Sequence, residues 1–277
     1  MELSVVIPVH NEASVLSELA RRTRAAALSC AASAEVLLVD DASRDDTAAC
    51  AATLSDDVVR FFHLTTQHGQ IGATRVGLAA AKGDLTVVLD GDLQDPPETM
   101  AELVATLRAR PDCDAVFAVK TSRDASLAGR AVFGAYHLAQ RVFGDAATPT
   151  DAGSYCAFRA PVREALLREP SSNANLAVLL GRQRVRWDVV GYHKHERAVG
   201  DSRVGAVGLL REAVDSLAAT GALSRMALTL GAMATLVTAS QQHRRTHIVA
   251  ATSIAASALV ALAHAYERRF ARAEAPP

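Results

Sequence analysis

The first ninety residues alternate short apolar segments with helical segments, and this alternation constrains the fold more than any other feature. The apolar segments are residues 3–8, 35–40, 58–64 and 85–89. Each has the length and composition of one buried strand, and the stretches between them have helical composition. Short apolar strands that alternate with helices form right-handed βαβ units, which build a parallel sheet covered on both faces. The sequence therefore predicts an α/β protein whose doubly wound, mainly parallel sheet carries helices on both faces.

Further elements follow the same pattern less regularly. Strands are expected over residues 115–119, 156–158 and 185–190. Helices are expected over residues 13–32, 73–81, 96–110, 127–143, 161–168 and 173–181.

Polar residues follow each of the first four strands at its carboxyl end. They are His10-Asn11-Glu12, Asp40-Asp41, Gln67 to Gln70, and Asp90 to Asp95. In open parallel sheets, ligands bind outside the carboxyl ends of the strands. These loops therefore predict one binding site at one edge of the sheet.

The loop after the fourth strand carries oxygen-bearing side chains at alternate positions, namely Asp90, Asp92 and Gln94. Alternate residues of an extended segment point the same way, so these side chains can converge on one cation. Oxygen ligands of this kind suit Mg²⁺ or Mn²⁺. The alternative interpretation is a solvated acidic turn that begins a helix.

Composition excludes several classes of protein. The 277 residues are 50% hydrophobic and 21% charged, which is enough apolar material for a sizeable core. The net charge of −1 argues against a surface that binds nucleic acid. The four cysteines lie far apart in the sequence, which fits a reduced, cytosolic protein, and the first residues do not resemble a signal peptide.

The composition changes after Val204, where alanine, leucine, valine and threonine dominate. Residues 226–240 and 246–266 carry no formal charge, and Arg244-Arg245 separates them, which predicts a helical hairpin. About 20 residues are needed to span a bilayer, but alanine contributes little to membrane insertion. We expect a main domain over residues 1–204 and a helical appendage over residues 205–277. The appendage is a weak membrane hairpin, a helical pair that lies on the membrane, or a dimerisation element.

The loops taken together resemble a family 2 glycosyltransferase of the GT-A fold. They are most similar to polyprenyl-phosphate hexose synthases, the group of dolichyl-phosphate mannose synthase and bactoprenol glucosyltransferase. The motifs that carry the resemblance are Val5 to Glu12, Leu38 to Thr47, Gly69-Gln70, Gly77 to Asp84, Leu89 to Pro97, Asp151 to Tyr155 and Glu196 to Arg203. The chain departs from the family at His10, where tyrosine or cysteine is usual, and at Ala42, where glycine is usual.

The resemblance implies an inverting, metal-dependent transfer of a hexose from a nucleotide-diphosphate sugar, UDP in preference to GDP. The cofactor would be Mg²⁺ or Mn²⁺, held by Asp90, Asp92 and Gln94. The residues expected to bind the nucleotide-sugar are Pro8, Asn11, Glu12, Asp41, Gln70 and Asp90. Among these, Asp41 would accept a hydrogen bond from the nucleobase, although a helix cap is the alternative role for this side chain.

The acceptor that the resemblance implies is a polyprenyl phosphate. A phosphate monoester has a second pKa of about 6, so it is a nucleophile at neutral pH and needs cations rather than a general base. The acceptor side of the site would be formed by Lys120, Arg123, Arg130, Arg197, Ser202 and Arg203. A hydroxyl acceptor would instead need a base, and Asp151 is the candidate. We therefore expect Asp92, Asp151 and Arg197 to be the catalytic residues.

Two other functions stay open from the sequence. One is a soluble glycosyltransferase of the same fold that acts on a hydroxyl or amine of a secondary metabolite or glycan. The other is an inactive scaffold that binds nucleotide-sugars. For the favoured function we expect a cytoplasmic protein at the cytoplasmic face of the membrane, with a homo-oligomer as a further expectation.

Overall fold

A computed structural model describes residues 1–121, 134, 138–139, 142–143, 149, 152–169, 175–193, 214, 217–218, 221–240 and 256–267. The chain separates into two compact units. The first comprises residues 1–124, 148–169 and 175–205, and the second comprises residues 125–147, 170–174 and 206–277. The boundary between residues 204 and 205 expected from the sequence remains a proposal.

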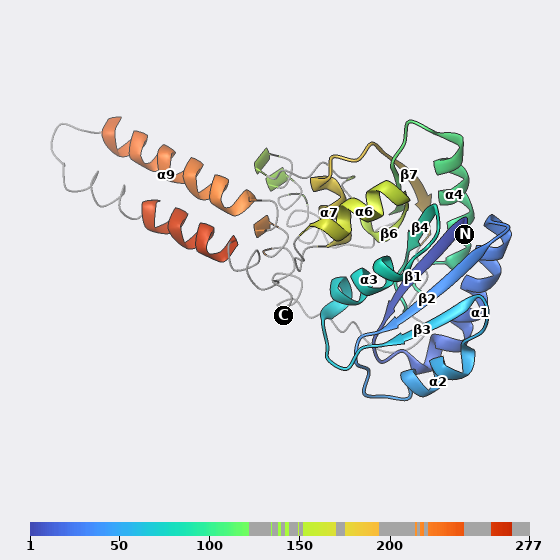
Figure 1. The fold of residues 1–277 in the computed structure, drawn as a ribbon. Coiled ribbons are helices and arrows are strands. Elements are labelled where there is room, and N and C mark those ends of the chain that lie inside the picture. The colour runs from blue at the N-terminus through green and yellow to red at the C-terminus, as the bar shows by residue number, and fades with distance from the viewer. Residues whose placement is uncertain are drawn as a thin grey trace. The chain divides into compact units, whose positions relative to one another are not determined.

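A seven-stranded sheet forms the centre of the first unit (Figure 1). Its strands, in spatial order, are β3 (Val59–His63), β2 (Ala34–Asp40), β1 (Leu3–Val9), β4 (Leu85–Val88), β6 (Ala152–Arg159), β5 (Ala115–Lys120) and β7 (Trp187–Tyr192). All neighbouring strands are parallel except β6, which runs antiparallel to both β4 and β5. The predicted mainly parallel α/β sheet is confirmed.

Helices cover both faces of this sheet, which is why its central strands are mainly apolar. One layer contains α1 (Ala13–Cys30), α2 (Thr47–Leu54) and α4 (Met100–Ala109), which follows the short 3₁₀ helix η1 (Pro97–Thr99). The other layer contains α3 (Gly69–Ala80), α6 (Ala160–Arg168) and α7 (Leu176–Arg182).

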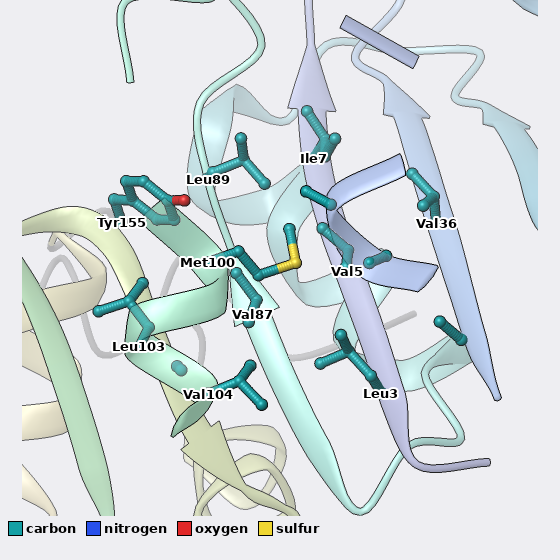
Figure 2. Packing of buried hydrophobic residues seen from close by; sticks show 14 of the residues in the cluster. Leu3, Val5, Ile7, Val36, Val87, Leu89, Met100, Leu103, Val104 and Tyr155 are labelled. Carbon is teal, nitrogen blue, oxygen red and sulfur yellow. The ribbon is translucent and has the colours of Figure 1, made fainter. Parts of the chain in front are cut away.

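The core lies between the sheet and the α1–α4 layer (Figure 2). Alternate residues of a strand face the same side, so the odd-numbered residues of β1 pack together against this layer. Ten of the side chains drawn in Figure 2 are labelled, and they lie on β1, β2, β4, β6 and α4 or, for Leu89, directly after β4. They are Leu3, Val5, Ile7, Val36, Val87, Leu89, Met100, Leu103, Val104 and Tyr155. This packing fixes the strand ends whose loops form the polar edge.

Helix α3 approaches the other face of the sheet at a glycine. A Cβ atom at Gly77 would lie 2.3 Å from Val6 Cγ1 and 3.2 Å from Val39 Cγ2. Only glycine allows the helix to lie this close to β1 and β2. The close approach places the first turn of α3 beside the carboxyl ends of those strands.

A buried polar network lies near the amino ends of the strands, opposite the edge that carries the polar loops. The Ser4 hydroxyl donates to Glu35 Oε1 at 2.7 Å, and the backbone N–H of Lys82 donates to the same carboxylate oxygen at 2.8 Å. Arg60 adds an ion pair with Glu35 Oε2 at 2.8 Å. Burial opposes ionisation of this carboxyl, but these donors outweigh it and lower the pKa of Glu35 below its ordinary value.

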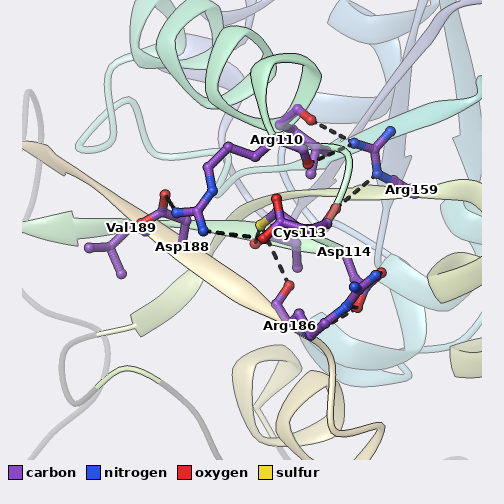
Figure 3. A network of polar contacts seen from close by, with 10 residues as sticks. Arg110, Cys113, Asp114, Arg159, Arg186, Asp188 and Val189 are labelled. Carbon is purple, nitrogen blue, oxygen red and sulfur yellow. Dashed lines mark hydrogen bonds and ion pairs between the residues drawn. The ribbon is translucent and has the colours of Figure 1, made fainter.

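Charged side chains also tie the end of α4 to β5 and β7 (Figure 3). Arg110 pairs with Asp188, and Arg186 pairs with Asp114 through Nε at 3.0 Å. Arg159 donates to the carbonyl oxygens of Leu107, Arg110 and Cys113, so it satisfies groups that the end of α4 leaves without helical partners. The outer strands are thereby held at the amino ends of β5 and β7.

In the second unit, α9 (Ala222–Ser240) and a helix over residues 256–267 lie in contact. The Glu267 carboxylate accepts hydrogen bonds from the backbone N–H and the hydroxyl of Ser224, in the first turn of α9. A Cβ atom at Gly231 would lie 2.7 Å from Ala256 Cβ, so small residues allow the close contact. Among the described helices, none is both long enough and apolar enough to cross a membrane.

The structure differs from the sequence prediction at several boundaries. Helix α3 begins at Gly69 rather than at residue 73, because the carboxylate of Asp41 accepts the backbone N–H groups of its first turn. The segment after Pro96 begins as a 3₁₀ turn before α4. The short strand expected over residues 156–158 is the eight-residue β6.

Candidate functional site

The loops after β1 and β2 are joined by hydrogen bonds between residues more than thirty positions apart. The Asn11 backbone N–H donates to Ser43 Oγ, and Asn11 Oδ1 accepts from the Arg44 backbone N–H, each at 2.8 Å. The Glu12 backbone N–H donates to Thr47 Oγ1 at 2.8 Å. Asn11 has a φ of 55°, a left-handed conformation that asparagine tolerates better than most residues. These contacts hold the two predicted nucleotide-binding loops in one fixed arrangement.

His10 adds a side-chain link between the same loops. Its Nδ1 lies 2.8 Å from the Asp41 carbonyl oxygen, and its Nε2 lies 3.1 Å from Asn11 Nδ2. A carbonyl oxygen only accepts and an amide nitrogen only donates, so Nδ1 carries the proton and Nε2 accepts. The ring therefore connects the two loops, at a position where the resemblance predicts tyrosine or cysteine.

Asp41 is buried, and its carboxylate holds the start of α3. Its Oδ1 accepts from the His68 backbone N–H at 2.6 Å, and its Oδ2 accepts from the Gly69 backbone N–H at 2.8 Å. A helix leaves its first N–H groups without partners, and a carboxylate is favourable at that end of the helix dipole. Asp41 thus acts as a helix cap. The helix that it caps is α3, and not α2, which is the next helix in the sequence. Its predicted contact with a nucleobase would use the remaining acceptor capacity of these two oxygens.

Asp40 forms a pair with His63 that the sequence analysis did not single out. The two residues are register partners at the ends of β2 and β3, and His63 Nδ1 lies 2.7 Å from Asp40 Oδ2. Asp40 is fully buried and also accepts from the backbone N–H and the hydroxyl of Ser43. An acidic residue at the last position of a buried strand, followed by a histidine at the end of the next strand, is the signal that predicts this pair.

The loop after β4 contains Asp90, and the side-chain amide of Gln70 contacts it. Gln70 Nε2, in the first turn of α3, donates to Asp90 Oδ1 at 2.5 Å and to Ser154 Oγ of β6 at 3.2 Å. Burial raises the pKa of the Cys156 thiol, and the nearby Asp90 carboxylate raises it further. Asp90 therefore lies where β4, β6 and α3 meet.

The next residues of this loop are fixed against β1. A Cβ atom at Gly91 would lie 2.8 Å from Val9 Cγ1 and 3.0 Å from the Pro8 carbonyl oxygen. Leu93 has a φ of 58° while its side chain is buried, so burial of leucine offsets an unfavourable backbone conformation. Asp92 Oδ1 accepts from the Gln94 backbone N–H at 3.1 Å.

The far end of the loop is held by two tyrosines. Tyr192 donates to the buried carboxylate of Asp95, and Tyr155 donates to the Pro96 carbonyl oxygen at 2.9 Å. The two rings pack edge to face with their centroids 5.9 Å apart. Burial, with the charge of Asp95, raises the pKa of both phenols above the ordinary value. Residues 90–96 are thus held from β1, β6 and β7 together.

The donor set of this loop fits a hard divalent cation. Asp90, Asp92 and Gln94 supply oxygens of the type that Mg²⁺ and Mn²⁺ prefer. The contact to Asp90 from Gln70 and the contact to Asp92 from Gln94 are both made by uncharged groups. Within the described residues no three His, Cys, Asp or Glu side chains cluster as a metal site, so a cation here would rely on the amide of Gln94 or on substrate oxygens. The metal assignment therefore stays a prediction.

The structure places the predicted donor-side residues along one edge of the sheet. Pro8 lies in β1, Asn11 and Glu12 follow it, and Asp41 follows β2. On the acceptor side, Lys120 is the last residue of β5. The other acceptor-side and base candidates lie outside the described residues, and they are Arg123, Arg130, Asp151, Arg197, Ser202 and Arg203.

Comparison with curated proteins finds similar sequences among proteins named as sugar transferases. An undecaprenyl-phosphate 4-deoxy-4-formamido-L-arabinose transferase from Salmonella paratyphi A is 35% identical over 217 residues, which cover 76% of this chain. The matched segment spans 64% of the length of that relative.

Solved structures share the fold at lower sequence identity. Mannosyl-3-phosphoglycerate synthase from Rubrobacter xylanophilus superposes with a TM-score of 0.60 at 17% identity, over 89% of this chain and 78% of that one. Glucosyl-3-phosphoglycerate synthase from Mycobacterium tuberculosis, in complex with Mn²⁺, UDP and glucosyl-3-phosphoglycerate, superposes with a TM-score of 0.55 at 20% identity, over 79% and 80% of the two chains. The predicted GT-A fold is confirmed.

The family comparison covers the strands of the sheet other than β7, together with the loops described above. The sequence model of the family described as "Glycosyl transferase family 2" matches residues 4–167, which is more than half of the 277 residues. The match includes the loops after β1 and β2, the first turn of α3 and the loop after β4. The chain belongs to glycosyl transferase family 2.

Proposed function

We propose that this protein is an inverting, metal-dependent glycosyltransferase that moves a hexose from a UDP-sugar to a polyprenyl phosphate. The observation that carries the proposal is the 35% identity, over 217 residues, to a transferase whose acceptor is undecaprenyl phosphate. The polar edge of the sheet supports the proposal, because hydrogen bonds hold the loops after β1, β2 and β4 in place and these loops carry side-chain oxygens.

The donor would bind along this edge. Pro8, Asn11, Glu12 and Asp41 would line the nucleoside, and Asp41 would contribute its remaining acceptor capacity to the uracil imide. Asp90, Asp92 and Gln94 would hold Mg²⁺ or Mn²⁺, which supplies Lewis-acid stabilisation of the departing diphosphate when bound. The fixed loops reduce the ordering that substrate binding would otherwise require.

The acceptor phosphate would act as its own nucleophile. One of its oxygens forms a bond to the anomeric carbon while the bond from that carbon to the nucleotide diphosphate breaks, which inverts the configuration. A phosphate monoester with a second pKa of about 6 has already lost its protons near pH 7, so no side chain must remove one. Lys120 at the end of β5 would bring positive charge to the phosphate. Arg123, Arg130, Arg197, Ser202 and Arg203 would complete the acceptor side.

The second unit would bring the protein to the cytoplasmic face of the membrane that carries the acceptor. Large apolar side chains are exposed on its two described helices, namely Leu228, Leu230, Met233, Leu259 and Leu262. Amphipathic or apolar helices of this kind bind membranes at the interface without crossing them.

The experiment that tests the proposal is mass spectrometry of products. The full chain is incubated with Mn²⁺, undecaprenyl phosphate and, one at a time, several UDP- and GDP-sugars. The expected product is a glycosyl undecaprenyl phosphate, from a UDP-sugar and with inverted anomeric configuration. A product formed only on hydroxyl acceptors would overturn the assignment of the acceptor.

Two variants make that test sharper. Arg197→Ala should raise the concentration of undecaprenyl phosphate that gives half-maximal rate. Asp151→Asn should leave transfer to phosphate intact, because only a hydroxyl acceptor needs the base. Loss of transfer to phosphate in Asp151→Asn would contradict the role of the phosphate as its own nucleophile.

A further inference from the structure

The side chain of Gln70 joins three elements of the site. Its Nε2 carries two hydrogens, and it lies 2.5 Å from Asp90 Oδ1 and 3.2 Å from Ser154 Oγ. Asp90 follows β4, Ser154 lies in β6, and Gln70 lies in the first turn of α3. One amide group thus fixes the carboxylate of Asp90 relative to an adjacent strand and a helix.

The backbone of Gln70 is itself held in place. The Asp41 carboxylate accepts from the N–H groups of His68 and Gly69, the two residues before Gln70. The carbonyl oxygen of Gln70 accepts from the Thr74 hydroxyl at 2.7 Å. The amide therefore extends from an anchored helix end, which limits its motion and that of the carboxylate it contacts.

The neutral charge of this contact matters for a cation site. A lysine or arginine in the place of Gln70 would also orient Asp90, but its positive charge would repel a divalent cation. An amide donates the same kind of hydrogen bond and adds no positive charge beside Asp90. Outer-shell donors of this type orient metal-binding carboxylates and affect metal affinity strongly.

We infer that Gln70, itself held by Ser154, is a positioning residue that orients the Asp90 carboxylate for the divalent cation. The family resemblance implies instead that Gln70 touches the nucleotide-sugar. The positioning role rests on the proposed function, because it requires the metal site of that function.

The test measures Mn²⁺ affinity of the full chain directly, by electron paramagnetic resonance of free Mn²⁺ with and without UDP. Gln70→Met keeps the length of the side chain and removes the donor, and it should weaken Mn²⁺ binding by about 10- to 100-fold. Ser154→Ala should weaken it less, because the bond to Asp90 remains. Gln183→Ala, at the end of α7, is the control and should leave Mn²⁺ binding unchanged.

A double-mutant cycle separates positioning from a general structural effect. If Gln70 acts through Asp90, then Gln70→Met should have no further effect on Mn²⁺ affinity in the Asp90→Asn background. Equal losses in both backgrounds would overturn the inference, and so would unchanged Mn²⁺ affinity in Gln70→Met alone.

The outcomes also distinguish this inference from the proposed function. Unchanged Mn²⁺ binding in Gln70→Met, with sugar transfer by the wild-type chain intact, overturns only the inference. Failure of the wild-type chain to bind Mn²⁺ in the presence of UDP overturns both the metal site and the inference.

Discussion

The hydroxyl of Tyr192, on β7, donates a hydrogen bond to the buried carboxylate of Asp95, in the loop that follows β4. This contact joins the outermost strand on one side of the sheet to the loop that carries the candidate metal ligands. Tyr192→Phe would leave a buried carboxylate without this donor, and it should lower the free energy of unfolding by about 1.5–3 kcal/mol.

Urea denaturation of the full chain measures that loss. Tyr155→Phe is the matched comparison, because its hydroxyl donates to an uncharged carbonyl oxygen and should cost only about 0.5–1.5 kcal/mol. Equal losses in the two variants would mean that the charge of Asp95 adds nothing to the bond.

The raised pKa values of the same tyrosines predict how the free energy of unfolding changes at alkaline pH. Burial raises the pKa of Tyr155 and Tyr192 in the folded protein, whereas an unfolded tyrosine has a pKa of about 10. A raised folded pKa gives stability that is fully present below pH 10 and that falls as the pH rises further. Each phenol should contribute about 1.4 kcal/mol per pH unit to this decline, so Tyr192→Phe should make it shallower. A decline of unchanged slope, measured by urea denaturation from pH 9 to 11, would contradict this.

Ala42 adopts a φ of 55° in the loop after β2. Left-handed backbone is unfavourable for alanine and free of steric cost for glycine, so Ala42→Gly should stabilise the fold by about 1 kcal/mol. Ala52→Gly, in helix α2, is the control and should destabilise by about 0.5–1 kcal/mol. Thermal unfolding should show a higher midpoint temperature for Ala42→Gly and a lower one for Ala52→Gly. A lower midpoint temperature in both variants would refute the backbone argument.

Glu35 should make the fold sensitive to acid. Burial opposes its charge, but donors from Ser4, Lys82 and Arg60 lower its pKa in the folded state. A lowered folded pKa gives stability that is present above the unfolded value of about 4.3 and that is lost as the pH falls below it. Glu35→Gln should therefore be less stable at pH 7 and lose less on acidification. Glu102→Gln, exposed on α4, is the control, and the free energy of unfolding of Glu35→Gln and of this variant is measured by urea denaturation from pH 7 to pH 3.

Asp92→Asn tests the metal assignment in the proposed reaction. Loss of one charged ligand should lower the rate of sugar transfer by at least about 100-fold, while the unfolding curve stays that of the wild type. Asp57→Asn, exposed before β3, should keep full activity. Normal transfer by Asp92→Asn would remove this carboxylate from the metal site.

The sequence predicted the first half of the sheet because its signals are local. Residues 3–8, 35–40 and 85–89 are short apolar runs, and β1, β2 and β4 lie within one residue of those bounds. Polar residues at their carboxyl ends meet at one edge, as the topology of parallel strands requires. The family membership predicted from the same loops is confirmed.

The remaining features depend on contacts between distant residues. No local sequence pattern in residues 152–159 indicates that β6 runs antiparallel between β4 and β5. The start of α3 depends on Asp41, which is 28 residues away from Gly69. Gln70 reaches Ser154 across 84 positions of sequence. Pattern and propensity do not encode such partners, since tertiary packing decides them.

The position of β6 has a consequence for synthesis of the chain on the ribosome. Residues 1–121 contain β1 to β5, yet β4 finds its neighbour on one side only when residues 152–159 emerge. Until then the nascent chain presents an unpaired, mainly apolar strand edge at Leu85–Val88, which is a template for aggregation. Elongation proceeds at about 5–20 residues per second, so the delay lasts a few seconds. Shortened forms that end before residue 152 should therefore accumulate as insoluble protein, whereas the completed sheet has no such edge at its centre.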